Sequence, residues 1–325
     1  MGERFEDGFG GTVAVVTGGG SGMGRELVRQ LAAQGCDVAT CDVLADNLDE
    51  TAAMCAADGS SGEVITRVAD VSDESQVLAF RDAVAAWRPH VHALFNNAGI
   101  GGGGSIVVDD RSGWEKTFNV DFWGVYYGTV NFLPLLMKAD VGHVVNTSSV
   151  NGFWASLGPG VAHTAYSAAK FAVKGFTEAL ITDFRINAPH IHASVVMPGH
   201  IGTSIVLNSR RLLGADPKEM TAEQVQQVRD RMKAVGIDLS GASDEDIRVG
   251  IQMQGESFRD DAPMTAAEAA THILESVSRD EWRILVGDDA VILDLMVREN
   301  PTEAYEPGFM DRVRARGAFG FTDRG

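Results

Sequence analysis

The sequence predicts an α/β fold in which helices cover both faces of a parallel, doubly wound β-sheet. Short apolar, β-branched runs alternate with longer segments of helical spacing, and this alternation recurs along most of the 325 residues. A glycine cluster stands directly after the first such run, where a strand would turn into a helix. A single domain of this class fits the length of the chain.

The first βαβ unit is predicted near the N-terminus. Residues 12–17, TVAVVT, have the β-branched composition of a strand that is buried on both faces. A helix is expected over 24–35, because leucines recur at helical spacing and a glycine ends the pattern. The next strand is expected at 37–43, so strand, glycine turn, helix and strand fit within about 30 residues.

The alternation continues over the rest of the chain. Further strands are expected at 63–71, 92–99, 142–149, 192–199 and 282–287. Further helices are expected at 72–87, at 112–139, around Tyr166 and at 265–277. Two of these helices begin with the S/T-x-x-E spacing of a capping box, at Ser112 and at Thr265. Repeated βα units of this kind produce a parallel sheet.

Two segments depart from this pattern. Residues 204–264 are rich in charge and methionine and lack strand signals. Thr221 and Gln224 have capping-box spacing at the start of an amphipathic stretch. We therefore expect a helical insertion within one domain of residues 1–325. Residues 301–325 contain few apolar residues and are expected to be irregular, with packing on a neighbouring subunit as a hypothesis.

Composition excludes several classes of protein. The net charge of −18 and the pI near 4.8 disfavour nucleic acid and anionic membranes as partners, because both would be repelled. No run approaches the ~20 apolar residues of a membrane span, and the acidic N-terminus resembles no export signal, so a cytoplasmic location is expected. Cys36, Cys41 and Cys55 lack metal-ligand spacing, so we expect reduced, structural cysteines and no metal site.

The glycine cluster TGGGSGMG, residues 17–24, predicts a site for a dinucleotide. Gly18, Gly22 and Gly24 lie between a strand and a helix, where backbone amides and the positive end of the helix can face a pyrophosphate. Asp42 ends the second strand, where a carboxylate accepts hydrogen bonds from ribose hydroxyls and repels a 2′-phosphate. NAD(H) is therefore favoured over NADP(H). A tight turn without a ligand is the alternative.

Tyr166 and Lys170 are four residues apart in the alanine-rich stretch HTAYSAAKFAV, so a helix would place both on one face. A free phenol has a pKa near 10 and is a poor base at neutral pH. Because a neighbouring ammonium favours the phenolate, we expect Lys170 to lower the pKa of Tyr166.

In this order, the motifs resemble those of the short-chain dehydrogenase/reductase family, in its single-domain form with the T-G-x-x-x-G-x-G loop and the Y-x-x-x-K active site. The resemblance covers residues 12–203 and 265–287. It implies a Rossmann-like fold and an enzyme that acts on CH–OH groups. The implied reaction is a hydride transfer that depends on NAD, with NADP less favoured.

The resemblance implies catalytic roles for four residues: Asn119, Ser149, Tyr166 and Lys170. Tyr166 would exchange a proton with the substrate oxygen, and Ser149 would hydrogen-bond the same oxygen. Gly152, three residues later, selects Ser149 rather than Ser148. Lys170 would also bind the nicotinamide ribose, and Asn119 with a water would return the proton to solvent.

The resemblance also implies the residues that contact the cofactor. Asp70 and Val71 match the family's adenine-contacting pair. The segments NNAG, 96–99, and PGHIGT, 198–203, match those that border the cofactor and its nicotinamide. The full set is Gly18, Ser21, Gly22, Met23, Gly24, Asp42, Asp70, Val71, Asn97, Ala98, Gly99, Tyr166, Lys170, Pro198, Gly199, Ile201 and Thr203.

The substrate is predicted from the lining expected around this site. That lining is largely apolar and includes Phe153, Trp154, Leu157, His163, Met197 and His200. It favours a bulky hydrophobic secondary alcohol or its ketone, aromatic or alicyclic, although the same aromatics could equally belong to the core. The insertion at 204–264 is expected to act as a lid that excludes water. The NAD(H) preference favours oxidation.

Two alternatives remain open. A 3-oxoacyl thioester reductase would favour NADPH and basic residues near the pocket mouth, which Asp42 and the acidic composition oppose. A non-catalytic dinucleotide sensor would be expected to lack part of the Ser/Tyr/Lys set. The resemblance also implies a homotetramer that packs through helices near 121–138 and 166–185, or a homodimer if the C-terminus limits assembly.

Overall fold

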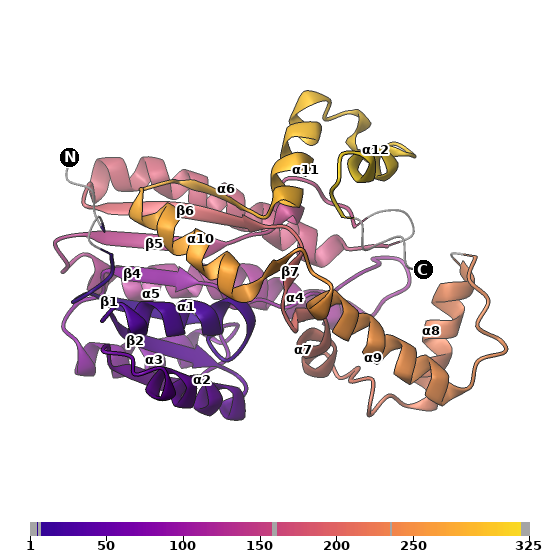
Figure 1. Ribbon diagram of the computed structural model, residues 1–325, viewed down its shortest axis with the longest axis horizontal. Helices are drawn as coiled ribbons and strands as arrows, with labels where there is room; N and C mark the ends of the chain where they lie inside the picture. Colours follow the sequence, from indigo (N-terminus) through magenta and orange to yellow (C-terminus); the bar gives the residue numbers. More distant parts are fainter. Residues whose placement is uncertain (1–4, 6–7, 158–160, 235, 320–325) are drawn as a thin grey trace.

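A seven-stranded parallel sheet forms the centre of the computed structural model, which describes residues 5, 8–157, 161–234 and 236–319 (Figure 1). The strands lie in the order β3-β2-β1-β4-β5-β6-β9. Their bounds are β1 Val13–Thr17, β2 Asp37–Asp42, β3 Val64–Val68, β4 Ala93–Asn96, β5 Gly142–Thr147, β6 Ile191–Pro198 and β9 Arg283–Val286. The order reverses between β1 and β4, and parallel sheets bind ligands at the carboxyl ends beside such a reversal. The predicted doubly wound sheet is confirmed.

Helices cover both faces of the sheet, as the alternation predicted. One face packs against α1 (Gly22–Ala33) and α10 (Ala266–Ser278), which also contact each other. The other face packs against α3 (Glu74–Trp87), α5 (Gly124–Leu136) and α6 (Thr164–Asn187). Strand β1 contributes side chains to both cores and is buried along its whole length.

The helix expected at 112–139 is divided into three parts. α4 (Arg111–Phe118) leads into a π-helical turn, η1 (Asn119–Trp123), and α5 continues from it. A π-helical turn inserts an extra residue into a helix and is frequent at functional sites. The insertion rotates the residues that follow it relative to a regular helix, so the sequence pattern alone does not give their direction.

Of the three capping boxes predicted from the sequence, the structure contains two. The Asp110 side chain accepts a hydrogen bond from the Ser112 amide, so Asp110 caps α4 and the capping box expected to start at Ser112 is wrong. Aspartate is at least as good a cap as serine, and it stands two residues earlier. The boxes expected to start at Thr221 and Thr265 are confirmed by reciprocal hydrogen bonds.

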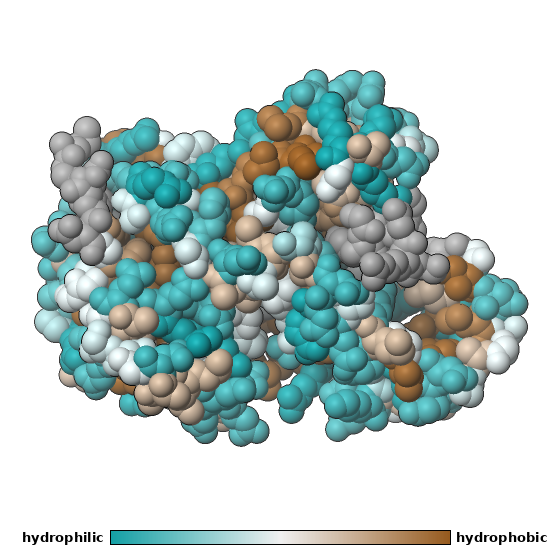
Figure 2. All heavy atoms as spheres, in the orientation of Figure 1, coloured by the Kyte–Doolittle hydropathy of each residue, from teal (hydrophilic) through white to brown (hydrophobic). Residues whose placement is uncertain are grey.

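Residues 204–264 form an extended helical unit on one side of the molecule (Figure 1). It contains α7 (Ile205–Leu212), α8 (Ala222–Ala234) and α9 (Asp244–Asp260), so the helical prediction is confirmed. Two short parallel strands join its ends: β7 (Ile201–Gly202) and β8 (Met264–Thr265). α8 and α9 share a small apolar core of their own, and Figure 2 shows hydrophobic residues on this outer part. We call this unit the helical insertion.

Residues 301–319 include a 3-10 turn and a short helix and pack on their own chain, so the expectation of an irregular tail is wrong for this part, while residues 320–325 lie outside the described residues. After α11 (Asp288–Glu299), Glu303–Tyr305 form a 3-10 turn and Phe309–Ala315 form α12 (Figure 1). Phe309 and Val313 are buried against α11. The apolar residues of this segment are few, but α12 gathers them on one face, and this makes the segment fold.

None of the helices among the described residues is long and apolar enough to cross a membrane. The described residues also contain no group of three His, Cys, Asp or Glu side chains placed to hold a metal ion. Cys36, Cys41 and Cys55 are buried and unbridged, as expected. Burial raises the pKa of the Cys36 and Cys41 thiols to about 12, so both stay protonated.

Candidate active site

The glycine loop after β1 has the geometry that a phosphate-binding turn requires. Gly18 and Gly22 have φ angles of 70° and 54°, in the left-handed region that favours glycine. A Cβ on Gly18 would lie 2.8 Å from Ala98 Cα, and one on Gly24 would lie 2.0 Å from the Gly18 carbonyl oxygen. In the described structure the Ser21 side chain does not cap the first amides of α1. These amides are available to an anionic group.

Asp42 ends β2 beside this loop, as predicted. Its Oδ2 atom accepts a hydrogen bond from the Gly20 amide at 3.0 Å, and its Oδ1 atom accepts one from the Leu44 amide at 3.1 Å. Burial raises the pKa of the Asp42 carboxyl, and backbone hydrogen bonds partly offset this effect. A carboxyl group therefore borders the glycine loop at the end of the second strand, the position that binds ribose in dinucleotide folds.

Arg25 is a cation near the loop that sequence reasoning missed. It donates hydrogen bonds to the Gly20 carbonyl oxygen at 2.6 Å and to Glu50 of α2 (Ala45–Ala57) at 2.5 Å. Its guanidinium group is thus already engaged by the loop and by a carboxylate. The position of Arg25 one helical turn after Ser21 is the signal that could have revealed it.

The predicted cofactor residues after β4 and β6 approach the glycine loop. The Thr17 hydroxyl accepts hydrogen bonds from the Asn97 and Ala98 amides at 3.0 and 3.1 Å. Thr203 packs on the loop, since a Cβ on Gly22 would lie 3.1 Å from its Cγ2 atom. The carboxyl ends of β1, β4 and β6 are thereby connected at one edge of the sheet.

Other residues of the predicted cofactor set pack in the core or take part in hydrogen bonds that shape the backbone. Met23 and Ile201 pack in the core on the α1 side of the sheet. Pro198 ends β6, and the Gly199 amide donates a hydrogen bond to β9 at 2.9 Å. Asp70 accepts hydrogen bonds from the amide and hydroxyl of the serine two residues later, which fixes the turn after β3.

Tyr166 and Lys170 lie one turn apart on α6, next to the end of β5. The Lys170 ammonium lies 5.3 Å from the centroid of the Tyr166 ring and donates a hydrogen bond to the Thr147 carbonyl oxygen at 3.1 Å. The Ser149 side chain lies close enough to the Tyr166 phenol to favour its deprotonated form, and its Oγ atom accepts a hydrogen bond from the Asn151 amide at 3.1 Å. The Ser148 hydroxyl instead donates to the Lys170 carbonyl oxygen at 2.7 Å. Ser149 is thus the serine that faces the phenol.

Asp121, which sequence reasoning missed, lies beside this group, whereas Asn119 does not. Asn119 begins the π-helical turn with an exposed side chain. Asp121 is fully buried, accepts a hydrogen bond from the Ile100 amide at 2.9 Å, and places Oδ1 3.8 Å from Lys170 Nζ. The structure therefore places Asp121, and not Asn119, next to Lys170. A single carboxylate in the apolar stretch VDFWGVYY is the signal that could have revealed it.

The pKa values of Asp121 and Tyr166 are shifted by burial and by the charges next to them. Burial raises the pKa of the Asp121 carboxyl to about 6, although Lys170 opposes the shift. Burial and the negative charge of Asp121 raise the pKa of the Tyr166 phenol, and the Ser149 side chain only partly offsets this. The pKa of Tyr166 is therefore raised rather than lowered in this structure, first because the phenol is buried and second because Asp121 is negatively charged.

His163, at the N-terminal end of α6, lies against the same phenol. Its ring centroid is 4.7 Å from that of Tyr166. Burial lowers the pKa of His163 to about 4, so its imidazole is neutral at pH 7. Of the residues predicted to line a substrate pocket, His163 is the one that the structure places beside the phenol.

Most of the other predicted pocket residues belong to the core, which was the alternative. Trp154, Met197 and His200 are buried. His200 Nε2 donates a hydrogen bond to the Phe258 carbonyl oxygen at 2.7 Å, and Phe153 packs with the C-terminal helices. Leu157 is 41% exposed. The apolar lining predicted for the substrate is therefore only partly present, and these side chains do not define it.

The helical insertion contacts two loops at the carboxyl edge of the sheet. The Ser209 hydroxyl of α7 accepts a hydrogen bond from the Gly101 amide at 2.7 Å. Asn208 Nδ2 donates one to the Ser21 hydroxyl of the glycine loop at 3.2 Å. α7 therefore links the loop after β4 to the glycine loop, at the edge where the predicted site residues meet.

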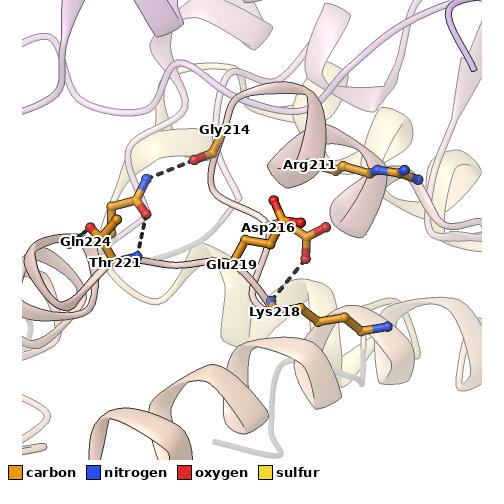
Figure 3. Close-up of a pocket in the computed structure, with 7 residues that line it drawn as sticks. All are labelled: Arg211, Gly214, Asp216, Lys218, Glu219, Thr221 and Gln224. Atoms are coloured by element: carbon orange, nitrogen blue, oxygen red, sulfur yellow. Dashed lines mark hydrogen bonds between the residues drawn. The ribbon is translucent and has the colours of Figure 1, made fainter.

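A hollow of about 700 Å³ lies where α7 leads into α8 (Figure 3). It is lined by Arg211, Gly214, Asp216, Lys218, Glu219, Thr221 and Gln224. Gln224 donates a hydrogen bond to the Gly214 carbonyl oxygen and accepts one from the Thr221 amide, as the dashed lines in Figure 3 mark. Among the described residues that line it, none belongs to the predicted catalytic or cofactor set. We therefore assign this hollow to the framework of the helical insertion.

Comparison with known proteins agrees with this geometry. Residues 12–212 match the model of the short chain dehydrogenase family. The SadH protein of Mycobacterium tuberculosis is 40% identical over 208 residues, which are 64% of this chain and 73% of that protein. Levodione reductase of Leifsonia aquatica is 34% identical over 227 residues, 69% of this chain and 81% of the reductase. A short chain dehydrogenase/reductase from Burkholderia phymatum, solved in complex with NAD, is 28% identical with a TM-score of 0.70, covering 91% of this chain and 95% of that chain.

Proposed function

The chain belongs to the short-chain dehydrogenase/reductase family and is an oxidoreductase that acts on CH–OH groups, and on this premise we propose that it interconverts a bulky hydrophobic secondary alcohol and its ketone with NAD(H). The observation that carries the proposal is the grouping of Ser149, Tyr166 and Lys170 at the edge of the sheet that also holds the glycine loop. A phenol and a hydroxyl in mutual contact can both reach one substrate oxygen.

The glycine loop fits a nicotinamide dinucleotide. Gly18 and Gly22 adopt left-handed backbone angles, and a side chain at Gly24 would collide with the loop. We infer that the first amides of α1 bind the pyrophosphate and that Asp42 binds the ribose of the adenosine half. When bound, the dinucleotide would supply the hydride acceptor or donor.

The preference for NAD(H) over NADP(H) rests on two observations. Asp42 places a carboxyl group at the end of β2, where a 2′-phosphate would meet a like charge. Arg25, the cation near the loop, is held by the Gly20 carbonyl oxygen and by Glu50, so it is not free to bind a phosphate. Similar solved structures hold either cofactor: the relative from Burkholderia phymatum was solved with NAD, and a metagenomic short-chain oxidoreductase was solved with NADP.

Each residue of the site would have a separate role in the reaction. Tyr166 would exchange a proton with the substrate oxygen, and Ser149 would hydrogen-bond that oxygen as it gains or loses charge. Lys170 would orient the ribose of the bound dinucleotide through its ammonium, which the Thr147 carbonyl oxygen already holds in place. α7, anchored on Gly101, would cover the substrate and exclude water.

The substrate class is supported by the surroundings of the phenol and by one relative. His163, next to Tyr166, is neutral at pH 7, so it adds no cation that would select an acidic substrate. Levodione reductase is named for the reduction of a dione, which is a ketone. A bulky ketone and its alcohol therefore fit better than a charged thioester, for which basic groups at the pocket mouth would be expected.

We also propose a homo-oligomer that packs through α5 and α6. Large hydrophobic side chains are exposed along this part of the chain, including Trp123, Met137 and Phe171. Exposed apolar residues on neighbouring helices are typical of an interface between subunits. Light scattering on the purified chain would distinguish a tetramer or a dimer from a monomer, and a monomer at micromolar concentration would overturn the proposal.

The proposed function is tested by measuring first the binding of the cofactor and then the turnover of candidate substrates. NADH and NADPH are titrated by fluorescence, and a set of cyclic, aromatic and steroidal alcohols and ketones is then screened with the preferred cofactor. We expect tighter binding of NADH and turnover that is lost in Tyr166→Phe. A preference for NADPH with activity on acyl thioesters would support the thioester reductase instead. Binding of NADH without any turnover that depends on Tyr166 would support the dinucleotide sensor.

A further inference from the structure

Asp121 is a buried carboxylate that the proposed roles of Ser149, Tyr166 and Lys170 do not use. It lies on the π-helical turn between α4 and α5, and its side chain is fully enclosed. Its Oδ1 atom lies 3.8 Å from Lys170 Nζ, and Lys170 Nζ lies 5.3 Å from the centroid of the Tyr166 ring. The Asp121 carboxyl group, the Lys170 ammonium and the Tyr166 phenol are thus neighbours, and the two charged side chains are buried.

The backbone seals this pair of charges. A Cβ on Gly99 would lie 2.8 Å from Asp121 Oδ1 and 3.2 Å from Lys170 Nζ, so the segment after β4 packs directly on both groups. The Ile100 amide donates to Oδ1, whereas Oδ2 is buried and makes no hydrogen bond in the described structure. Water does not screen charges in such surroundings, so each acts strongly on its neighbours.

The titratable groups on α4 and at the start of α6 do not influence the protonation of the Tyr166 phenol, because they are paired elsewhere or neutral. On α4, Arg111 pairs with Glu115, and Lys116 Nζ donates to a carbonyl oxygen of α7. His163 touches the Tyr166 ring, but it is neutral at pH 7 because burial lowers its pKa to about 4. The 3-10 turn Val150–Gly152, which also packs on α6, carries no titratable side chain.

Charged groups on the other elements packed against α6 lie away from the phenol. His143 of β5 and His192 of β6 stand at the amino ends of their strands, opposite the site. Lys174, one turn after Lys170 on α6, pairs with Glu178 on the same helix. Among the described residues, Asp121 and Lys170 are therefore the charges that act on Tyr166 at neutral pH.

We propose that Asp121 is a positioning residue whose carboxylate neutralises the Lys170 ammonium and thereby keeps the Tyr166 hydroxyl protonated, so that the site is set to donate a proton to a ketone. The inference rests on the proposed function of the same site. An ammonium without this partner would favour the phenolate, which accepts the proton of an alcohol. Asp121 removes that bias.

The reduction that this arrangement favours is balanced in atoms and electrons. The O–H bond of Tyr166 breaks, and its proton forms the O–H bond of the product alcohol. The carbonyl carbon gains a hydride, with both bonding electrons, from a reduced nicotinamide dinucleotide. The carbonyl π bond becomes the electron pair of the new O–H bond. The sequence favoured oxidation on the ground of NAD(H) preference, and Asp121 favours the reverse direction.

The test removes the charge of Asp121 and keeps its shape. Asp121→Asn is compared with wild type by the ultraviolet absorbance of tyrosinate from about pH 7 to about pH 12.5, a range that extends well above the pKa near 10 of a free tyrosine. Each spectrum is corrected with the same protein carrying Tyr166→Phe, so that the difference reports Tyr166 alone. Asp183→Asn, which removes an exposed carboxylate from α6, is the matched control. Circular dichroism checks that each variant is folded over this range.

We expect the Tyr166 signal to begin at least about one pH unit lower in Asp121→Asn than in wild type, and Asp183→Asn to match wild type. The double variant Asp121→Asn/Lys170→Gln, which lacks both charges, should return toward wild type. Equal titration of Tyr166 in wild type and Asp121→Asn would overturn the proposal. If Asp121→Asn does not fold, Lys170→Gln is compared with the double variant instead. Lys170→Gln keeps the Asp121 charge without its partner, so its Tyr166 signal should begin at a higher pH than that of the double variant.

The titration needs neither substrate nor cofactor, so its result is independent of turnover. A shift of the Tyr166 signal without any turnover would contradict the proposed function and leave the charge coupling intact. Turnover that depends on Tyr166, without a shift, would contradict the role of Asp121 alone. Where turnover is found, the kcat/KM of ketone reduction should fall at a pH about one unit lower in Asp121→Asn, since the phenol loses its proton earlier.

Discussion

The indole Nε1 of Trp154 donates a 2.7 Å hydrogen bond to the carbonyl oxygen of Ala304, 150 residues later in the chain. Trp154 lies in the loop between β5 and α6 that also carries Ser149, and its ring packs against Phe309 of α12. The Tyr305 hydroxyl accepts a hydrogen bond from an amide of the same loop at 3.0 Å. The C-terminal segment therefore holds the loop on which the proposed catalytic serine lies.

Trp154→Phe should destabilise the protein, because the buried Ala304 carbonyl oxygen loses its hydrogen bond while an aromatic ring still fills the space. An unsatisfied buried polar group costs about 1–3 kcal/mol, and we expect a loss of this size in the free energy of unfolding measured in urea. Trp282→Phe, at a side chain that is 44% exposed, is the control. Equal losses in the two variants would show that the hydrogen bond has no special role.

Tyr166→Phe removes the hydroxyl that is proposed to exchange the proton and keeps the ring that packs against His163. Loss of a positioned acid or base lowers rates by roughly 10²–10⁴-fold, so kcat/KM should fall by at least about 10²-fold. NADH affinity should stay within about twofold, because the glycine loop is untouched. Tyr127→Phe, on α5, serves as the control and should keep its activity. Retained turnover in Tyr166→Phe would exclude the phenol as the proton donor.

Most of the fold could be predicted because it depends on local patterns. The strand at 12–17 and the helix at 24–35 follow from β-branched composition, from helical spacing and from the glycines between them. Tyr166 and Lys170 could be placed together because helical periodicity alone brings residues four apart onto one face. The structure confirms this placement on α6.

The parts that could not be predicted depend on non-local packing. The sequence could not show that Asp121 lies beside Lys170 while Asn119 is exposed, because a π-helical turn alters the direction of these residues and composition gives no sign of that turn. The C-terminal residues 301–325 were expected to be irregular, yet Trp154 and Val150 provide an apolar surface on which α12 folds. Residues that are about 150 positions apart in the chain form this surface together, so local sequence patterns do not reveal it.

Asp42→Asn should weaken the preference for NAD(H). The variant keeps a hydrogen-bonding group for the ribose but removes the negative charge that would repel a 2′-phosphate. We expect the ratio of NADPH to NADH affinity to rise by about tenfold, a change of about 1.4 kcal/mol. Asp46→Asn, in the exposed first turn of α2, is the control. A ratio that does not change would mean that Asp42 only supports the loop through the Gly20 and Leu44 amides.

His163 should make the stability of the fold depend on pH. Its pKa in the folded protein is about 4, and that of a free histidine is about 6.5. Between these values the unfolded chain binds more protons than the folded chain, so stability falls as the pH is lowered from about 6.5 to about 4. His163→Phe should remove about 1–3 kcal/mol of this loss in urea unfolding measured at several pH values. Parallel pH curves for the two proteins would contradict the neutral state of the half-buried His163.

Ser209→Ala should loosen the helical insertion over the proposed substrate site. The Ser209 hydroxyl accepts a hydrogen bond from the Gly101 amide, and this bond joins α7 to the loop after β4. Without it, closure of the insertion is less favourable by roughly 1 kcal/mol, so KM for the substrate should rise about fivefold. NADH affinity should change little, because the α1 amides and Asp42 remain. Ser257→Ala, at an exposed serine of α9, removes a hydroxyl from the same insertion without touching this contact. If both variants raise KM alike, the insertion acts through its general stability, whereas an effect confined to Ser209→Ala assigns the closure to the contact between α7 and Gly101.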